Sequence, residues 1–380
     1  MEILKFSDEH NKFRQHVREF VQTEIIPNID QWSKDKFMPK TVWKLMGQAG
    51  LLCPDMPKKY GGSGGDFLNS VIVAEEIIMS GTMGAGPTGH SDIFVPYITV
   101  YASEELKQRY LPGCVSGDIV TAIAMTEPDA GSDLASMRTT VEEDGDDVVF
   151  NGSKIFISNG IVCDLLILAA KDPLENDPYK AISLYLVEDG TPGFDKGTKL
   201  EKMGMHQQDT AELFFNNCRV PKTNLIGEKG AGFKMLMEKL QQERLLVCIW
   251  AVNGAEYMLQ QTLEFYKENA GPGKKVPRSQ SNQFALVEMA TEVKLGRIFL
   301  DKLISDHMEG KNVIIETSME KFWATDMANR VADRCLDIFG MAGNFDSCPI
   351  KTICMEIKAS KIYAGTNEIM KIIIAKHMGI

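Results

Sequence analysis

The sequence lacks the signatures of several protein classes. Its 8 cysteines form no CxxC pair, and its 6 histidines form no cluster with metal-ligand spacing, so we expect no metal site. It has no run of eighteen apolar residues and no apolar leader in MEILKFSDEHNKFRQ, which argues against a membrane span or secretory signal. Scattered cysteines in a chain of this length suit free thiols in a reducing compartment. We therefore expect a complete cytoplasmic protein.

Positive charge is also scarce. Lys and Arg number 41 against 52 Asp and Glu, which gives a formal net charge of -11 and a pI near 5.2. Nucleic acids and anionic membranes bind basic surfaces, so neither is an expected partner. A phosphate-bearing ligand must be held by a few local donors.

The predicted elements are helical, then β, then helical. Apolar residues at helical spacing follow Ser7, a plausible N-cap, and the pattern stops at Pro27; further helices are expected at 39–50, 68–79 and 104–111. Short β-branched or apolar runs separated by Gly, Asp, Asn and Pro occupy residues 119–220, with a hairpin turn at the Asp-Gly of EEDGDDVVFNGSK. Long helical patterns then cover 233–268, 283–308, 315–339 and 358–377.

Helices this long need partners for their apolar faces, which predicts a bundle. The expected architecture is an α+β multidomain protein: an N-terminal α domain (1–118), a middle β domain resembling a sandwich or barrel (119–228) and a C-terminal four-helix bundle (229–380).

Two short motifs have the chemistry of a cofactor site. TEPDAGSD at 126–133 places the hydroxyls of Thr126 and Ser132 in a turn whose backbone N–H groups could bind a ring carbonyl or a pyrophosphate. An ordinary Pro-Asp turn followed by a Gly turn explains the same residues. KIFISNG at 154–160 places Phe156 and Ser158 two apart on a predicted strand, hence on one face, where a planar cofactor could stack and accept a hydrogen bond.

The chain as a whole resembles the acyl-CoA dehydrogenase family. The resemblance covers nearly all of it and rests on EFVQTEIIP, PKKYGGSGG, RYLPGCVSGDIVTAIAMTEPDAGSD, NGSKIFISNG, KMGMHQQDTAELFFNNCRVPKTNLIGEKGAGF and IYAGTNEI, in that order. It implies FAD as cofactor, an acyl-CoA thioester as substrate, electron-transferring flavoprotein as electron acceptor and usually a homotetramer.

The resemblance also implies site residues. Thr126 and Ser158 correspond to residues at the polar edge of the flavin ring, with Phe156 against the ring where the family commonly has tryptophan. Ser132 corresponds to a residue at the CoA and flavin phosphates. The full expected sets are Met125, Thr126, Ser132, Phe156, Ser158, Thr366 and Glu368 for the cofactor, and His90, Ser132, Arg244, Tyr363, Ala364 and Gly365 for the substrate. A purely structural role for His90 is an equal alternative.

Other positions depart from the family pattern. Where the family has an arginine, a phenylalanine and a glycine that hold the FAD of a neighbouring subunit, this chain has Asn269, Pro272 and Gly273. Where the family often has QxxGG, it has Asp337, Gly340 and Met341. The contacts to the adenine side of FAD are therefore in question.

The usual catalytic base is missing. Most members carry a glutamate between the Tyr and Gly-Thr of IYxGT, and here that residue is Ala364, which accepts no proton. Two carboxylates are candidate replacements. Glu243 occupies the position at which isovaleryl-type members place their base, although a helix glutamate in a surface ion pair is the plain alternative. Asp92 lies in the apolar stretch TGHSDIFVP, where a helix cap is the plain alternative.

The two candidates imply different reactions. Asp92 would reach acyl carbons farther from the thioester, which suits 1,4-dehydrogenation of a cyclic enoyl-CoA, as in the cyclohex-1-ene-1-carboxyl-CoA dehydrogenases of anaerobic bacteria that this pattern resembles. The sequence favours this hypothesis. Glu243 would instead serve α,β-dehydrogenation of a branched or cyclic saturated acyl-CoA. A flavoprotein subunit that binds acyl-CoA without catalysis is the third possibility.

Overall fold

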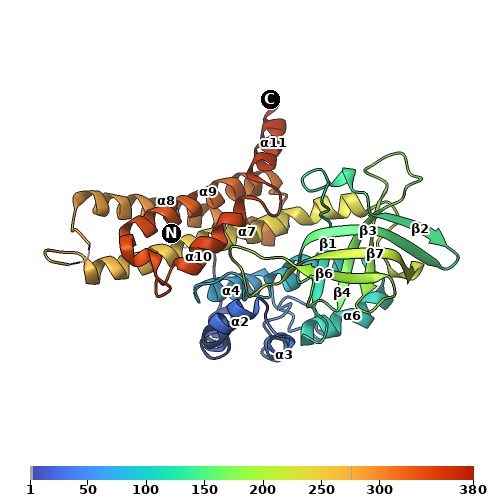
Figure 1. The fold of residues 1–380 in the computed structure, drawn as a ribbon, viewed down its shortest axis with the longest axis horizontal. Coiled ribbons are helices and arrows are strands. Elements are labelled where there is room, and N and C mark those ends of the chain that lie inside the picture. Colours follow the sequence, from blue (N-terminus) through green and yellow to red (C-terminus); the bar gives the residue numbers. More distant parts are fainter. Residues whose placement is uncertain (1–2, 275) are drawn as a thin grey trace.

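The computed structural model describes residues 3–274 and 276–380. The molecule is elongated, with a β domain at one end, long helices at the other and the N-terminal helices below both (Figure 1). The N-terminal helices are α1 (Asp8–Phe20), α2 (Ile29–Asp35), α3 (Lys40–Gln48), α4 (Phe67–Ile78), α5 (Val95–Tyr101) and α6 (Glu104–Ser116). A π-helical turn, η4 (Gly89–Phe94), leads into α5.

The middle segment forms one mixed sheet. Its strands are β1 (Thr121–Ala124), β2 (Thr140–Asp144), β3 (Asp147–Ser158), β4 (Leu165–Lys171), β5 (Ile182–Glu188), β6 (Phe194–Lys199), β7 (Thr210–Pro221) and β8 (Leu225–Ile226). The order is β6-β7-β3-β2-β4-β5-β8, and β1 pairs with β4 in parallel. The predicted hairpin is confirmed, because β2 and β3 pair antiparallel from Asp144 and Asp147 outward.

Long helices form the last part of the chain. They are α7 (Gly232–Asn269), α8 (Gln280–Met308), α9 (Ile314–Phe339), α10 (Lys351–Glu356) and α11 (Asn367–Met378), with a 3-10 turn, η8 (Ile357–Lys361), before α11. α7 starts beside the sheet and runs the length of the bundle, while α11 projects from the body (Figure 1). α7, α8 and α9 pack on one another, α11 packs on α9, and α4 packs on α7. One apolar core therefore joins the N-terminal and C-terminal helices.

The α, then β, then α architecture predicted from the sequence is confirmed. Within the helices, Ser7 caps α1 as expected, since its hydroxyl accepts from the His10 N–H. Three expectations were wrong. The chain passes Pro27 through short π and 3-10 turns into α2, and α6 continues through Pro112 to a left-handed Gly117.

The third wrong expectation concerns the last helix. The predicted helix over 358–377 is two segments, η8 and α11, separated by a turn. Ala364 and Gly365 in this turn have left-handed backbones, with φ of 55° and 90°, and Thr366 then caps α11 by accepting from the Ile369 N–H at 3.3 Å. A left-handed pair cannot continue a right-handed helix.

Within the described residues, no helix combines the length and apolar character that crossing a bilayer requires. The eight cysteines are all free and buried. No group of three or more His, Cys, Asp or Glu side chains in residues 3–274 and 276–380 is arranged to hold a metal ion.

Candidate active site

The turn after β1 is fixed to β3 by a buried ion pair. The Lys154 ammonium donates to Glu127 Oε1 at 2.7 Å and to the Met125 carbonyl at 3.1 Å. Glu127 also accepts from the backbone N–H groups of Arg138 and Thr139. Burial lowers the pKa of Lys154 to about 8, while Glu127 opposes this shift. The pair holds the TEPDAGSD turn rigidly against the strand that carries KIFISNG.

The ring of Phe156 is exposed to solvent where β3 meets the turn after β1. The Ile155 N–H donates to the Thr126 carbonyl at 3.0 Å, so the two motifs are directly joined. Phe156 itself has a left-handed backbone (φ 60°) and a side chain that is 64% exposed. The register of β3 against β7 shifts between Lys154 and Ile157. A bulge therefore interrupts the strand between Lys154 and Ile157. Beyond it, the buried Ile157 separates the exposed Phe156 from the half-buried Ser158, and a shared face for Phe156 and Ser158 stays a prediction.

These residues fit a planar cofactor. An exposed aromatic ring in a constrained backbone lies beside a turn in which Met125 and Thr126 are half-buried, and Ser158 is half-buried at the end of β3. Ser132 is exposed on the same turn. Thr366 and Glu368 lie elsewhere, at the N-terminus of α11, where Glu368 is exposed in the first turn.

The adenine-side positions show no comparable fit. The Asn269 amide donates to the Phe265 carbonyl of its own helix at 3.0 Å, and Pro272 and Gly273 are exposed in the loop after α7. Asp337 is also exposed, on the last turn of α9.

The turn at Ala364 is held from two helices. The Arg244 Nε of α7 lies 3.4 Å from the Ala364 carbonyl oxygen, and the Lys321 ammonium of α9 donates to the Gly365 carbonyl at 2.7 Å. Tyr363 packs edge-on against Trp250 of α7, with ring centroids 6.0 Å apart. Its buried hydroxyl has no hydrogen-bond partner in the part of the chain that the structure describes. Arg244, Tyr363, Ala364 and Gly365 thus lie together, as a shared substrate site requires.

Glu243, directly before Arg244 on α7, is buried. Its side chain is 4% exposed, and Oε1 accepts from the Tyr97 hydroxyl at 2.7 Å. Burial raises the pKa of Glu243 to about 7, opposed by the Tyr97 hydrogen bond and by the charges of Arg244 and Lys239. The alternative of a surface ion pair was therefore wrong for this glutamate.

Asp92 is the second buried carboxylate, in η4, and it is also 4% exposed. Burial raises its pKa to about 8; the nearby Asp55 adds to the rise and the Ser70 hydroxyl opposes it. The Gln242 amide of α7 donates to the Asp92 carbonyl at 2.8 Å. Both candidate bases consequently lie where η4 and α5 pack on α7.

His90 has a different role from the one expected. Its Nδ1 accepts from the Thr121 N–H at 3.1 Å, and its Nε2 lies 3.0 Å from the Cys114 carbonyl. Both ring nitrogens are used in linking η4 to β1 and α6, so neither is available to a substrate. Burial lowers the pKa of His90 to about 4. The expected substrate contact is corrected to a structural one.

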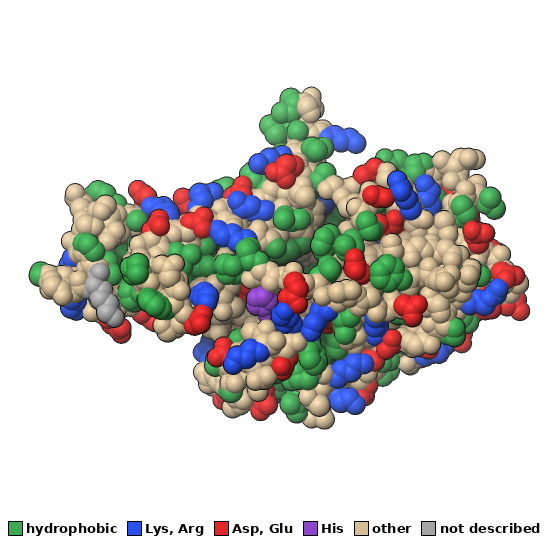
Figure 2. Space-filling model, in the orientation of Figure 1, with side chains coloured by type: hydrophobic (Ala, Val, Ile, Leu, Met, Phe, Trp, Pro, Cys, Tyr) green, Lys and Arg blue, Asp and Glu red, His purple; other side chains and the backbone are tan. Residues whose placement is uncertain are grey.

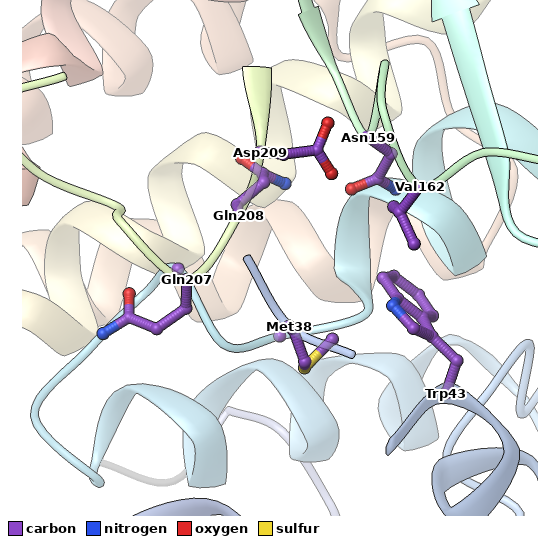
Figure 3. Close-up of a pocket in the computed structure, with 9 residues that line it drawn as sticks. Met38, Trp43, Asn159, Val162, Gln207, Gln208 and Asp209 are labelled. Atoms are coloured by element: carbon purple, nitrogen blue, oxygen red, sulfur yellow. The ribbon is translucent and has the colours of Figure 1, made fainter. Parts of the chain in front are cut away.

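Two cavities lie away from these residues. One, of about 10 Å³, is lined by Trp43, Asn159 and Asp209 among others, and the buried Trp43 Nε1 has no partner in the described residues (Figure 3). It has room for one water. The other, of about 490 Å³, lies among α1, α4, α7 and α8, and its arginines Arg14 and Arg297 are paired with acids. Neither contains a candidate base.

Three residues of this site were not predicted. Lys154 stood inside a quoted motif, but nothing in the sequence indicated a buried partner. Tyr97 lies 146 positions from Glu243, and Lys321 lies 44 positions from Gly365. A lysine within the apolar core face of KNVIIETSMEKFWA was the only available signal for Lys321.

Comparison with known proteins agrees along the whole chain. The family descriptions "Acyl-CoA dehydrogenase, N-terminal domain", "middle domain" and "C-terminal domain" match residues 7–118, 122–218 and 230–379. The long-chain specific acyl-CoA dehydrogenase of mouse (Mus musculus) mitochondria is 41% identical over 98% of this chain and 87% of that protein.

Solved structures are also similar. The acyl-CoA dehydrogenase from Geobacillus kaustophilus has 48% identity and a TM-score of 0.96, with 99% of each chain covered. A chain in a structure described as the electron transferring flavoprotein of Acidaminococcus fermentans has 31% identity and a TM-score of 0.91, again with 99% of each chain covered.

Proposed function

This chain belongs to the acyl-CoA dehydrogenase family, FAD-dependent oxidoreductases that act on CH–CH groups, and on that premise we propose that it α,β-dehydrogenates saturated acyl-CoA thioesters with Glu243 as the base. The observation that carries the proposal is the position of Glu243. It is a buried carboxylate directly before Arg244, whose side chain reaches the Ala364 turn from which the usual glutamate is absent.

Ionisation favours Glu243 over Asp92. Burial raises the pKa of both carboxyl groups, that of Glu243 to about 7 and that of Asp92 to about 8. The Glu243 carboxylate is also stabilised by the Tyr97 hydroxyl and two cations, whereas the charged neighbour of Asp92 is another acid, Asp55. A base needs a pKa near the working pH and must be ionised to accept a proton.

The residues divide the work between cofactor and substrate. FAD, when bound, supplies the hydride acceptor for the substrate carbon β to the thioester. Phe156 would pack against its ring, Met125, Thr126 and Ser158 would meet its polar edge, and Ser132, Thr366 and Glu368 would lie toward its phosphates and ribityl side. Glu243 would take the proton from the α carbon.

The Ala364 turn would orient the thioester. In the described residues, the backbone N–H groups of Ala364 and Gly365 donate no hydrogen bond to another protein atom. A free N–H at this point can stabilise the negative charge that develops on the thioester oxygen when the proton leaves. Arg244, Tyr363 and Gly365 would form the rest of the substrate site around the thioester.

We propose long, unbranched acyl chains as the substrate class. The support is the 41% identity to the long-chain specific enzyme.

Asp92 supports a second candidate, the 1,4-dehydrogenation of a cyclic enoyl-CoA that the sequence favoured. A buried aspartate with a pKa of about 8 beside the same helix is costly to keep without a use. In this reaction Asp92 would remove the γ proton.

Two matched variants separate the candidates. Glu243→Gln and Asp92→Asn each remove one carboxylate with little change of volume, and both are assayed with palmitoyl-CoA and cyclohex-1-ene-1-carboxyl-CoA. We expect Glu243→Gln to lose at least about 100-fold in kcat on palmitoyl-CoA and Asp92→Asn to stay within a few-fold of wild type. Loss in Asp92→Asn alone, on the cyclic substrate alone, would establish the second candidate. A flavin that no acyl-CoA bleaches anaerobically would identify a non-catalytic subunit.

We further propose electron-transferring flavoprotein as acceptor, a homotetramer and a cytoplasmic location. The similarity to a chain from an electron transferring flavoprotein structure supports the first. Apolar side chains gather on the projecting α11, which suits a contact between subunits (Figure 2). Eight free cysteines suit a reducing compartment.

A further inference from the structure

Two cations from different helices hold consecutive carbonyl groups of one turn. Lys321 of α9 donates to the Gly365 carbonyl at 2.7 Å and to the Asn367 side-chain oxygen at 3.1 Å. Arg244 of α7 lies 3.4 Å from the preceding carbonyl, that of Ala364. The left-handed backbones of Ala364 and Gly365 point both oxygens at the bundle rather than along a helix.

Burial of the Lys321 ammonium in the helical core is energetically costly. Its side chain is fully buried, and burial lowers its pKa to about 8. The apolar side chains of Ala324 and Ala328 fill the same helix surface one and two turns further on. An ammonium in this core costs free energy unless its donors are used, and here two of its three donors are.

The consequence of this anchor reaches Glu243 through Arg244. The charge of Arg244 is one of the influences that hold the pKa of Glu243 down against burial. The Arg244 Nε, the guanidinium nitrogen nearest the main chain, lies within 3.4 Å of the Ala364 carbonyl oxygen. The position of the 364–365 turn therefore sets the distance between the Arg244 guanidinium and the carboxylate of Glu243, the preceding residue of α7.

We propose that Lys321 is a positioning residue for the acid–base site: by fixing the 364–365 turn, it holds Arg244 and the free N–H groups of that turn in place around Glu243. This role rests on the proposed function of Glu243. Lys321 touches neither substrate nor cofactor and acts only through the turn.

Other titratable groups lie around Lys321 and around Glu243. Around Lys321 these are Cys248 and Arg244 of α7, Asp326 of its own helix and Glu368 of α11. Around Glu243 they are Tyr97 of α5 and, on α7, Arg244 and Lys239. None of them bonds the turn carbonyls except Arg244, so removal of Lys321 leaves that residue as the remaining side-chain anchor.

The test compares Lys321→Met with Lys358→Met in the FAD-loaded protein. Lys358 also links the segment before the turn to α9, through Asp333 at 2.6 Å, but at the surface. We expect Lys321→Met to lower kcat about 10- to 100-fold with a smaller change in KM. The acid limb of the kcat–pH profile reports the ionisation of Glu243. It should move to higher pH by about half to one unit, because Arg244 no longer holds the pKa of Glu243 down. Lys358→Met should match wild type.

Additional variants keep the outcome decisive. Lys321→Arg retains a charged donor and should restore the wild-type limb, and Lys321→Gln replaces Lys321→Met if the latter does not fold. An unmoved acid limb in a folded Lys321→Met or Lys321→Gln protein overturns the positioning role while leaving Glu243 as base. If wild type dehydrogenates no saturated acyl-CoA, the proposed function fails instead. In that case, hydrogen exchange of the 362–367 amides tests whether Lys321 anchors the turn. Faster exchange in Lys321→Met than in Lys358→Met supports this role, and equal exchange overturns it.

Discussion

Glu320 shows how a single buried carboxyl group can weaken the fold as the pH rises. It lies on α9 next to Lys321, fully buried, and neither of its oxygens has a hydrogen-bond partner in the described residues. Burial alone raises its pKa from 4.5 to about 8. Between these two values the folded chain keeps the proton and the unfolded chain has lost it. Stability is therefore lost as the pH rises from about 4.5 through about 8.

Glu320→Gln removes this dependence. Because the amide has no charge to bury, we expect the variant to exceed wild type in unfolding free energy by a few kcal/mol at pH 8.5 and to match it near pH 4.5. Urea unfolding from pH 4.5 to 9 measures this, with Glu316→Gln on the exposed face as control. Parallel curves for Glu320→Gln and wild type would show that Glu320 is already ionised in the fold.

The backbone of Ala364 gives a second prediction at this scale. A non-glycine residue at φ 55° is strained by about 1 kcal/mol, so Ala364→Gly should not lower stability and should raise it by up to about that amount. Gly365→Ala should lower it by about 1–2 kcal/mol, because its φ is 90° and a Cβ would lie 2.9 Å from Met370 Cε. Denaturation midpoints of the two variants, measured side by side, should move in opposite directions. Equal shifts would contradict the left-handed turn.

At the scale of elements, the Glu127–Lys154 pair joins the turn after β1 to a bulged β3. The pair is almost completely buried and links two motifs that the sequence could only place on separate elements. A pair of this kind fixes geometry more than it adds stability, since its charges had to leave water. Thr126 and Phe156, which we propose lie at the flavin, depend on it for their relative position.

Lys154→Met should therefore do more than remove a contact. It leaves the Glu127 charge buried without its cation, which costs about 3–5 kcal/mol, and it should loosen the corner and lower the flavin absorbance retained per chain after gel filtration. Adding Glu127→Gln should recover part of the stability. Lys222→Met, which breaks a surface pair with Glu143 in the same domain, serves as control. Full flavin retention in Lys154→Met would separate the pair from the cofactor site.

At the scale of the whole molecule, α11 projects from the bundle and shows apolar side chains on its outer face. Ile372 is 61% exposed, and Met378 and Ile380 follow it, while Met370 and Ile374 face α9. An apolar patch on a helix that leaves the body suits an interface between copies of the chain.

Ile372→Lys should weaken that interface, since a charged side chain cannot be buried there without a partner. Light scattering after gel filtration is expected to give a tetramer mass for wild type and for His377→Ala, a change on another side of the same helix, but a smaller mass for Ile372→Lys. A monomeric wild type, or an unchanged mass in Ile372→Lys, would remove α11 from the interface.

The sequence determined the architecture and supplied most of the residues proposed for the site. Helical spacing over tens of residues and the β-branched runs between Gly and Asp were enough for the α, then β, then α order, because periodicity is a local property. Ordered motifs along the chain were enough for the family and its FAD chemistry. Ala364 showed by identity alone that the usual base is missing.

Only the tertiary structure decided how the site is held and which alternatives survive. The burial of Glu243, the hydrogen bonds that occupy both nitrogens of His90, and the anchoring of one turn by Lys321 and Arg244 all join residues far apart in the chain. The pKa of a carboxyl group depends on the solvent, charges and donors around it in three dimensions, and none of these can be counted along a sequence. The sequence favoured Asp92, and the reason to propose Glu243 instead is that its surroundings supply cations while those of Asp92 supply a second acid.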